Sequence, residues 1–200
     1  KGIKNSKLLG IASKDIGKLN KFKEHFEIDK NYCFLNYEDL IKNKEIDIVY
    51  IALPHIFHFE WINKCIDSKK NILSEKPATI SLSQIKIINQ KLNKNNIFFA
   101  EGFMYSYHPQ FTKLIEILNE KKIGEIIEME SSFGVNIVEK KNFFGFKKIK
   151  INKKSRLFKK ELAGGCILDL GCYPTSLSVV ITAIAPDSLK LRVSPEDSLE

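Results

Sequence analysis

The sequence predicts an α/β fold in which a doubly wound parallel sheet is followed by the start of an α+β domain. Short apolar runs alternate with longer helical stretches between residues 7 and 101, which is typical of βαβ units. The runs Asp47–Leu53 and Asn71–Ser74 each end at a polar or proline-containing loop, and the residues between them have helical length and spacing. Ligands of such sheets bind outside the carboxyl ends of the strands, so we expect Lys76 in a ligand crevice.

The elements of the first part follow from this alternation. Strands are expected at residues 7–13, 32–35, 47–53, 71–75 and 97–100, and helices at 15–26, 37–43, 58–68 and 81–94. The helix at 58–68 brings Trp61, Cys65 and either Ile62 or Ile66 onto one face. With 44% hydrophobic residues, the 200-residue chain can bury a sizeable core.

The pattern changes near Gly102, where we place the boundary between two domains, 1–102 and 103–200. In the second domain we expect a helix at 109–121, a long strand of alternating apolar residues at 125–135 and an irregular basic stretch at 136–160. An apolar helix at 166–183 and the first strand of a further sheet at 189–193 should follow. One long strand and one buried helix do not close a core. The chain is therefore expected to be a fragment that lacks both ends of a longer protein.

The basic residues argue against a nucleic-acid partner despite a net charge of +8. All of the 32 basic residues except Arg156 and Arg192 are lysines, whereas arginine is the usual base-reading and stacking residue. The lysines are spread along the chain, and the joint excess of Lys, Ile and Asn is typical of a codon bias toward A and T. Their densest cluster, within 140–154, is expected to be a solvated loop.

The cysteines predict neither a metal centre nor a disulfide framework. Cys33, Cys65, Cys166 and Cys172 form no C-x-x-C pair and have no histidine at metal-ligand spacing. We expect buried thiols in a reducing compartment. No apolar run reaches the roughly 18 residues that span a bilayer, and Lys1 opens no secretory signal, so we expect a cytoplasmic protein without a membrane partner.

Two loops at strand ends are candidates for cofactor binding. The loop from Leu53 and Pro54 to His58 lies where the ribose or nicotinamide of a dinucleotide would sit, although the motif taken alone favours an ordinary strand-to-helix turn. Glu75 and Lys76 form a charged pair at the end of a buried strand, before a proline that stiffens the turn. The alternative for this pair is a surface turn.

An acid and a phenol lie four residues apart in the apolar helix expected at 166–183. Asp169 and Tyr173 would share one helix face. An acid in an apolar helix is costly to bury unless it is paired. The alternative is that Asp169 caps a local turn.

Five motifs occur in a characteristic order: Ser74–Pro77, Glu101–Tyr105, His108–Gln110, Arg156–Phe158 and Gly165–Tyr173. Together they resemble the glucose-fructose oxidoreductase / inositol dehydrogenase / rhizopine catabolism (Gfo/Idh/MocA) family of NAD(P)-dependent oxidoreductases. The resemblance is greatest to the branch with trans-dihydrodiol dehydrogenase and NADP-dependent D-xylose dehydrogenase, and it covers nearly the whole chain. It implies a Rossmann-type sheet whose first strand and glycine-rich phosphate loop are absent here.

The resemblance also implies a reaction and the residues that perform it. A hydride would move between NADP and the carbinol carbon of an aldose or a vicinal diol. Lys76 matches the family's active-site lysine, Tyr173 its proposed acid/base tyrosine, and Asp169 the carboxylate that orients substrate. We expect the ammonium of Lys76 to lower the pKa of Tyr173, so that its phenolate accepts the hydroxyl proton. No metal is implied, and the full-length protein would form a homodimer.

The residues after the expected second strand of the sheet favour NADP over NAD. In dinucleotide folds an acidic residue there binds the ribose 2′-hydroxyl of NAD, whereas a basic residue accommodates the 2′-phosphate of NADP. Ser13 and Lys14 supply a hydroxyl and a cation, although Asp15 follows immediately.

A non-catalytic protein is the alternative to the enzyme. The same family includes a galactose-regulon repressor, so the chain could belong to a regulatory protein that binds a sugar or a dinucleotide. The joint presence of Lys76, Asp169 and Tyr173 favours the enzyme.

Overall fold

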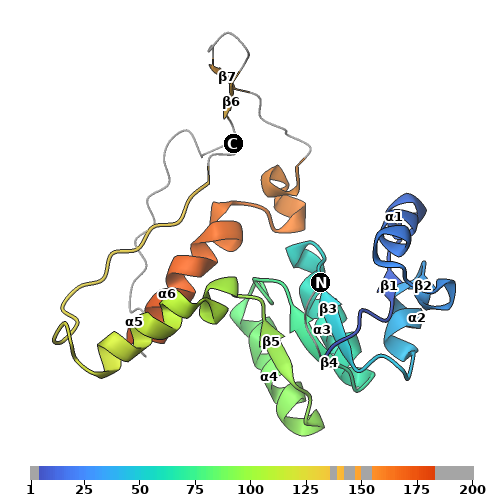
Figure 1. The fold of residues 1–200 in the computed structure, drawn as a ribbon, viewed down its shortest axis with the longest axis horizontal. Coiled ribbons are helices and arrows are strands. Elements are labelled where there is room, and N and C mark those ends of the chain that lie inside the picture. The colour runs from blue at the N-terminus through green and yellow to red at the C-terminus, as the bar shows by residue number, and fades with distance from the viewer. Residues whose placement is uncertain (1–4, 136–138, 142–146, 150–154, 183–200) are drawn as a thin grey trace. The chain divides into compact units, whose positions relative to one another are not determined.

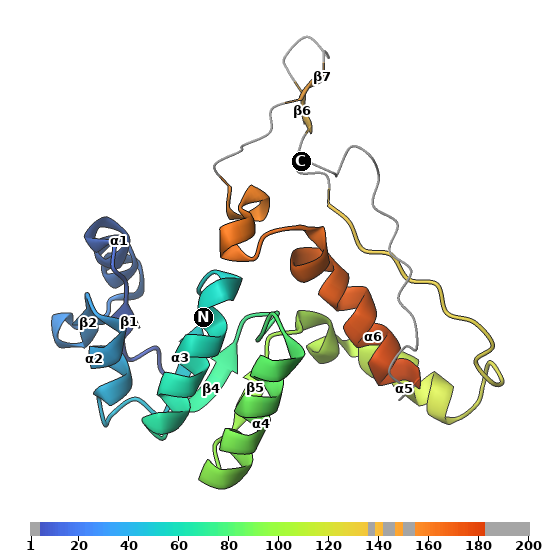
Figure 2. The same cartoon turned by 180° about the vertical axis from the view of Figure 1, so that it is seen from behind.

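The computed structural model describes residues 5–135, 139–141, 147–149 and 155–182 (Figure 1 and, from behind, Figure 2). The chain divides into two compact units, which we describe separately. The first contains Lys1–Ala52, His58–Ser74 and Leu82–Ala100, and the second contains Leu53–Phe57, Glu75–Ser81 and Glu101–Glu200. The loops that follow the third and fourth strands therefore belong to the second unit.

Two sheets form the framework of the first unit (Figure 1). In one, β1 (Ile11–Ala12) pairs in parallel with β2 (Cys33–Phe34). In the other, β3 (Ile48–Ile51), β4 (Asn71–Ser74) and β5 (Phe99–Glu101) are hydrogen bonded in this order, with β3 parallel to β4. Parallel strands that alternate with helices confirm the predicted α/β class.

Helices connect these strands as expected. Their bounds are Ile16–Phe26 for α1, Tyr37–Lys42 for α2, His55–Asp67 for α3 and Leu82–Asn95 for α4, with a 3-10 turn at Lys30–Tyr32. Side-chain caps start two of them, because Asp15 accepts a hydrogen bond from the backbone N–H of Lys18, and Asn36 from that of Glu38. Helix α3 begins three residues earlier than predicted, directly after Pro54, whose fixed φ suits the start of a helix.

The core of the first unit lies on α3, β4 and α4. Its side chains without exposed surface include Ile62, Cys65, Ile66, Ile72 and Ile88. The predicted buried face of α3 is confirmed, and it is wider than expected because both Ile62 and Ile66 are buried. Trp61 is buried beside them and packs edge-on against Tyr37, with ring centroids 5.0 Å apart.

The second unit is mainly helical in its described part. It has 3-10 turns at Met104–Tyr107, Arg156–Phe158 and Lys160–Leu162, and helix α5 at Pro109–Asn119. A π-helix at Ile167–Gly171 leads directly into α6 (Cys172–Thr182). The single apolar helix expected at 166–183 is therefore two helices of different register.

The strand content of the second unit differs from the prediction. Residues 125–135 form no strand, because within the described residues nothing pairs with them, and alternation alone does not supply the neighbour that a strand needs. The expected irregular stretch instead contains an antiparallel pair, β6 (Glu139–Lys141) and β7 (Lys147–Ile149). The expected strand at 189–193 lies outside the described residues.

One segment, Lys160–Thr182, is long and apolar enough to cross a membrane by length and composition. The segment includes the charged residues Lys160, Glu161 and Asp169, so it is not an uninterrupted apolar run. A core helix of a soluble protein passes the same test, so the criterion does not by itself assign the segment to a membrane.

All four cysteines are free thiols, in agreement with the prediction. Only Cys65 is buried, however, and Cys166 is exposed, so the expectation of uniformly buried thiols is wrong. Burial raises the pKa of the Cys65 thiol to about 12.

Candidate functional site

Lys76 stands on a loop that is fixed at both sides. It follows Ser74, the fully buried last residue of β4, and precedes the buried Ala78. The backbone N–H of Ala78 donates to Oε1 of Glu101 at 2.7 Å, which ties the loop to the end of β5. Only 11% of the Lys76 side chain is exposed.

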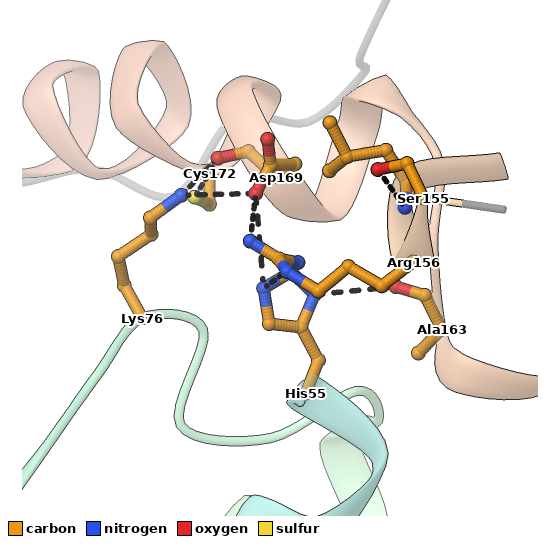
Figure 3. Close-up of polar contacts among 8 residues, drawn as sticks. His55, Lys76, Ser155, Arg156, Ala163, Asp169 and Cys172 are labelled. Carbon is orange, nitrogen blue, oxygen red and sulfur yellow. Dashed lines mark hydrogen bonds and ion pairs between the residues drawn. The ribbon is translucent and has the colours of Figure 1, made fainter. Parts of the chain in front are cut away.

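The carboxylate of Asp169 is the centre of a polar cluster in the second unit (Figure 3). Its Oδ1 lies 3.1 Å from Nη2 of Arg156 and 3.6 Å from Nζ of Lys76. The ammonium of Lys76 also donates to the main-chain carbonyl of Asp169. Two basic side chains thus flank this carboxylate, and 17% of the Asp169 side chain is exposed.

His55, the first residue of α3, joins the cluster as a neutral imidazole. Its Nδ1 lies 3.2 Å from the carbonyl oxygen of Ala163, which only accepts, so Nδ1 carries the hydrogen. Its Nε2 lies 3.2 Å from Nη1 of Arg156, which only donates, so Nε2 presents its lone pair. The 3.9 Å contact between Nε2 and the carboxylate of Asp169 is therefore not an ion pair.

All polar contacts that the described residues make to this carboxylate end on Oδ1. Oδ2 thus remains available as an acceptor for a hydroxyl group. Such an oxygen, fixed through its partner atom, is suited to orienting a polyol.

Tyr173 lies beside the same lysine, inside a group of aromatic rings. Nζ of Lys76 lies 4.7 Å from the centroid of the Tyr173 ring, a cation–π contact. The rings of Phe133 and Phe103 lie 4.9 Å and 5.7 Å from that of Tyr173. The hydroxyl of Tyr105 forms a 2.7 Å hydrogen bond with Ser176, which holds the 3-10 turn at 104–107 against α6.

The expected effect of Lys76 on Tyr173 is wrong in this structure. Burial raises the pKa of Tyr173, and the charges of Cys172, Glu75 and Asp169 raise it further. The physical reason is that the ammonium lies over the ring face, and the predicted lowering assumed that it neighbours the hydroxyl. Tyr173 is therefore a neutral phenol at physiological pH.

Ser13 and Lys14, the two residues predicted to favour NADP, follow β1 in the first unit. The hydroxyl oxygen of Ser13 accepts from the N–H of Asp15 at 3.2 Å and keeps its hydrogen for donation, and Lys14 is exposed. Asp15 is committed to capping α1, because its Oδ1 accepts from the N–H of Lys18 at 3.0 Å. That hydrogen bond lowers the pKa of Asp15. Asp15, the acidic residue that argued for NAD in the sequence, therefore serves as the N-cap of α1.

The other expected cofactor residues are divided between the units. Leu53, Pro54 and Glu75 belong to the second unit, together with Lys76. His58 belongs to the first unit and has no exposed surface, which favours its interpretation as a structural residue of α3.

Sequence reasoning did not select two members of the cluster, His55 and Arg156. They are 101 residues apart in the chain, so no local pattern links them. One signal was present, however. In a chain whose basic residues are almost all lysines, an arginine marks a position that needs the forked guanidinium.

Comparisons with known proteins place this site in context. The model of the Gfo/Idh/MocA family, described as "Oxidoreductase family, NAD-binding Rossmann fold", matches residues 2–103. The chain is 30% identical to trans-1,2-dihydrobenzene-1,2-diol dehydrogenase of Xenopus tropicalis, over 92% of this chain and 52% of that protein. It is 28% identical to D-xylose 1-dehydrogenase (NADP(+)) 2 of Haloferax volcanii, over 83% of this chain and 46% of that protein.

Solved structures give the same picture. A 3-ketoreductase from Actinomadura kijaniata, in complex with NADP and TDP-benzene, matches with a TM-score of 0.73 at 25% identity, over 88% of this chain and 49% of that one. An apo scyllo-inositol dehydrogenase from Lactobacillus casei matches with a TM-score of 0.58 at 26% identity, over 62% of this chain and 37% of that one. The chain spans about half the length of the curated relatives it matches.

Proposed function

The chain belongs to the Gfo/Idh/MocA oxidoreductase family with its NAD-binding Rossmann fold, and on that premise we propose that the full-length protein is an NADP-dependent dehydrogenase. It transfers a hydride between NADP and the carbinol carbon of an aldose or a vicinal diol. The observation that carries this proposal is the convergence of Lys76, Asp169 and Tyr173, with one ammonium touching both other residues. A binding protein without chemistry has no need to hold a cation against a phenol.

Each residue of the cluster has a role in this proposal. Oδ2 of Asp169 accepts a hydrogen bond from a substrate hydroxyl, while Arg156 and Lys76 hold Oδ1. Tyr173, as a neutral phenol, donates its proton to the oxygen of the reacting carbon when a carbonyl is reduced, and takes it back when an alcohol is oxidised. The bound nicotinamide supplies or accepts the hydride.

The choice of NADP rests on the end of β1. Lys14 supplies the cation that a 2′-phosphate needs, and Asp15 is occupied as a helix cap. The related D-xylose dehydrogenase of Haloferax volcanii carries NADP(+) in its name. Ser13 adds a hydroxyl donor beside the same position.

We also propose the wider setting of the enzyme. The partner is a small sugar or diol, the full-length protein is a homodimer by resemblance to its family, and the four free thiols favour a reducing compartment such as the cytoplasm. Light scattering of the full-length protein checks the dimer, and a monomer at micromolar concentration contradicts it.

The experiment is a steady-state assay of the full-length protein. NADP reduction is followed with a panel of pentoses, hexoses and dihydrodiols, and NADPH oxidation with the matching keto compounds. We expect turnover with at least one polyol class, and its loss in Tyr173→Phe. If no compound is turned over but a sugar binds in calorimetry, the protein is a regulatory binding member of the family and the proposal is wrong.

A further inference from the structure

Gly164 lies where two turns of the second unit are in main-chain contact. A Cβ at this position would stand 2.5 Å from the carbonyl oxygen of Arg156 and 2.7 Å from that of Leu157. Both oxygens belong to the main chain and cannot turn aside as the end of a flexible side chain would. The φ angle of Gly164 lies outside the left-handed region, unlike that of Gly165 at 107°. The close approach, and not the backbone conformation, is therefore what requires a glycine at 164.

Hydrogen bonds of the next residue fix the same two turns to each other. The N–H of Gly165 donates to the carbonyl of Leu157 at 2.9 Å. The carbonyl of Gly165 accepts from the N–H of Asp169 at 3.2 Å. The glycine turn thus links the main chain beside Arg156 to the start of the π-helix that carries Asp169.

The side chain of Arg156 is also held from this turn at its far end. The carbonyl oxygen of Ala163, directly before Gly164, lies 3.2 Å from Nδ1 of His55 (Figure 3). Nε2 of that imidazole lies 3.2 Å from Nη1 of Arg156, and Nη2 of Arg156 lies 3.1 Å from Oδ1 of Asp169. The main chain of Arg156 and its guanidinium therefore both depend on residues 163–165.

We propose that Gly164 is a positioning residue for Arg156 and, through it, for the carboxylate of Asp169. The absence of a side chain at 164 lets the turn at 156–158 lie close enough for its arginine to reach the imidazole and the carboxylate together. An alanine would push this main chain away by about 0.5 Å or more, which is the precision that a functional site needs. The competing interpretation is that the long arginine side chain absorbs the shift. The effect on turnover rests on the proposed function, whereas the placement of the guanidinium does not.

Gly164→Ala in the full-length protein separates these interpretations without an activity assay. A guanidinium that has lost its hydrogen bond to Asp169 should react about fivefold faster with phenylglyoxal. Mass spectrometry of the peptide that contains Arg156 measures this rate, and the peptide that contains Arg192 is the internal reference. Gly171→Ala is the matched control, because the nearest contacts of a Cβ there would be at an ordinary 3.7 Å. An unchanged reactivity of Arg156 overturns the positioning role.

A kinetic double-mutant cycle then asks whether Gly164 acts through Arg156. We expect Gly164→Ala to lower kcat/KM about tenfold in the wild type and less than twofold in Arg156→Met, where the misplaced group is already absent. Equal losses in the two backgrounds would mean that the alanine disturbs the fold in general, and the proposal would be wrong. If the reactivity rises as expected but the wild type turns over no polyol, the placement stands and only the proposed function fails.

Gly165→Ala replaces the first variant in both experiments if Gly164→Ala does not fold. A Cβ at 165 would meet no atom within 4 Å, but a φ of 107° is strained for alanine, so the hydrogen bond to Leu157 should weaken. We expect Arg156 to react about twofold faster with phenylglyoxal in this variant. A rate equal to that of the wild type would show that the glycine turn does not position the arginine.

Discussion

The guanidinium of Arg156 donates from Nη1 to Nε2 of His55 over 3.2 Å and from Nη2 to Oδ1 of Asp169 over 3.1 Å. One planar group thus joins a buried imidazole to the carboxylate at the centre of the site. The imidazole is fixed in turn by the carbonyl of Ala163, 3.2 Å from its Nδ1. Through Arg156 and His55, the orientation of the Asp169 carboxylate therefore depends on the backbone carbonyl of Ala163, which precedes Gly164 and Gly165.

Replacing the guanidinium of Arg156 by the ammonium of a lysine should weaken this arrangement. A lysine at 156 can contact Asp169 or His55 but cannot present two parallel donors, so we expect Arg156→Lys to lower kcat/KM by about 10-fold and Arg156→Met by about 100-fold. NADP affinity should stay unchanged. The control is Lys160→Met, which removes an exposed charge nearby. A wild-type kcat/KM in Arg156→Lys would show that the two donors of the guanidinium are not required.

Removing the ammonium of Lys76 should affect chemistry far more than cofactor binding. In full-length Lys76→Ala we expect kcat to fall by roughly 10²–10⁴-fold, because the contacts to Asp169 and Tyr173 are lost together. NADPH binding, followed by fluorescence titration, should change little. Lys64→Ala removes a lysine that pairs with Glu38 at 2.8 Å on the surface and serves as the control. Unchanged turnover in Lys76→Ala would sink the catalytic role.

Local patterns explain what the sequence predicted well. Strand β4 ends at Ser74, one residue before its expected end, because a buried apolar run followed by a charged pair and a proline is a local signal. The same signal predicted Lys76 at the end of this strand, whereas Asp169 and Tyr173 were predicted from a regular helical spacing that the π-helix interrupts. These features need no knowledge of distant parts of the chain.

Features that depend on distant contacts could not be predicted. The pKa direction of Tyr173 depends on whether the ammonium meets the ring face or the hydroxyl, and sequence spacing does not decide between them. The strand expected at 125–135 failed for a similar reason, since pairing requires a neighbour. The π-helix at Ile167–Gly171 breaks the 3.6-residue period on which the helix prediction was based.

Lys14 should decide the preference between the two nicotinamide cofactors. We expect Lys14→Glu to weaken NADPH binding by at least tenfold and to leave NADH binding nearly unchanged, because only NADPH carries the 2′-phosphate. Fluorescence titration of the full-length protein measures both constants. Lys18→Glu makes the same change in net charge at an exposed position of α1, and so controls for the effect of the overall electrostatic field on cofactor binding. If wild-type protein binds NADH more tightly than NADPH, the assignment of Ser13 and Lys14 is wrong.

Tyr173 should titrate above its ordinary pKa of 10.0, because burial disfavours the phenolate. The difference in phenolate absorbance between wild type and Tyr173→Phe isolates this one group. Its folded-state pKa is raised, so its contribution to stability is present below pH 10 and is lost as the pH rises through the folded-state pKa. A difference titration centred below 10 would instead support the phenolate that the sequence suggested.

Lys70 should be important for stability although it lies outside the candidate site. Its side chain is buried with 8% residue exposure, and Nζ donates to the carbonyls of Asn43 and Ile46 at 2.6 Å each. Lys70→Met keeps the apolar stem but leaves these acceptors without their donor, which should cost about 2–4 kcal/mol of unfolding free energy. Lys69→Met is the matched control, because that neighbour is exposed and its Nζ donates to the side chain of Asn95. Urea denaturation should show a clear loss of stability for Lys70→Met and none for Lys69→Met. Equal midpoints of the two variants would mean that water hydrogen bonds to the two carbonyls when the ammonium is removed.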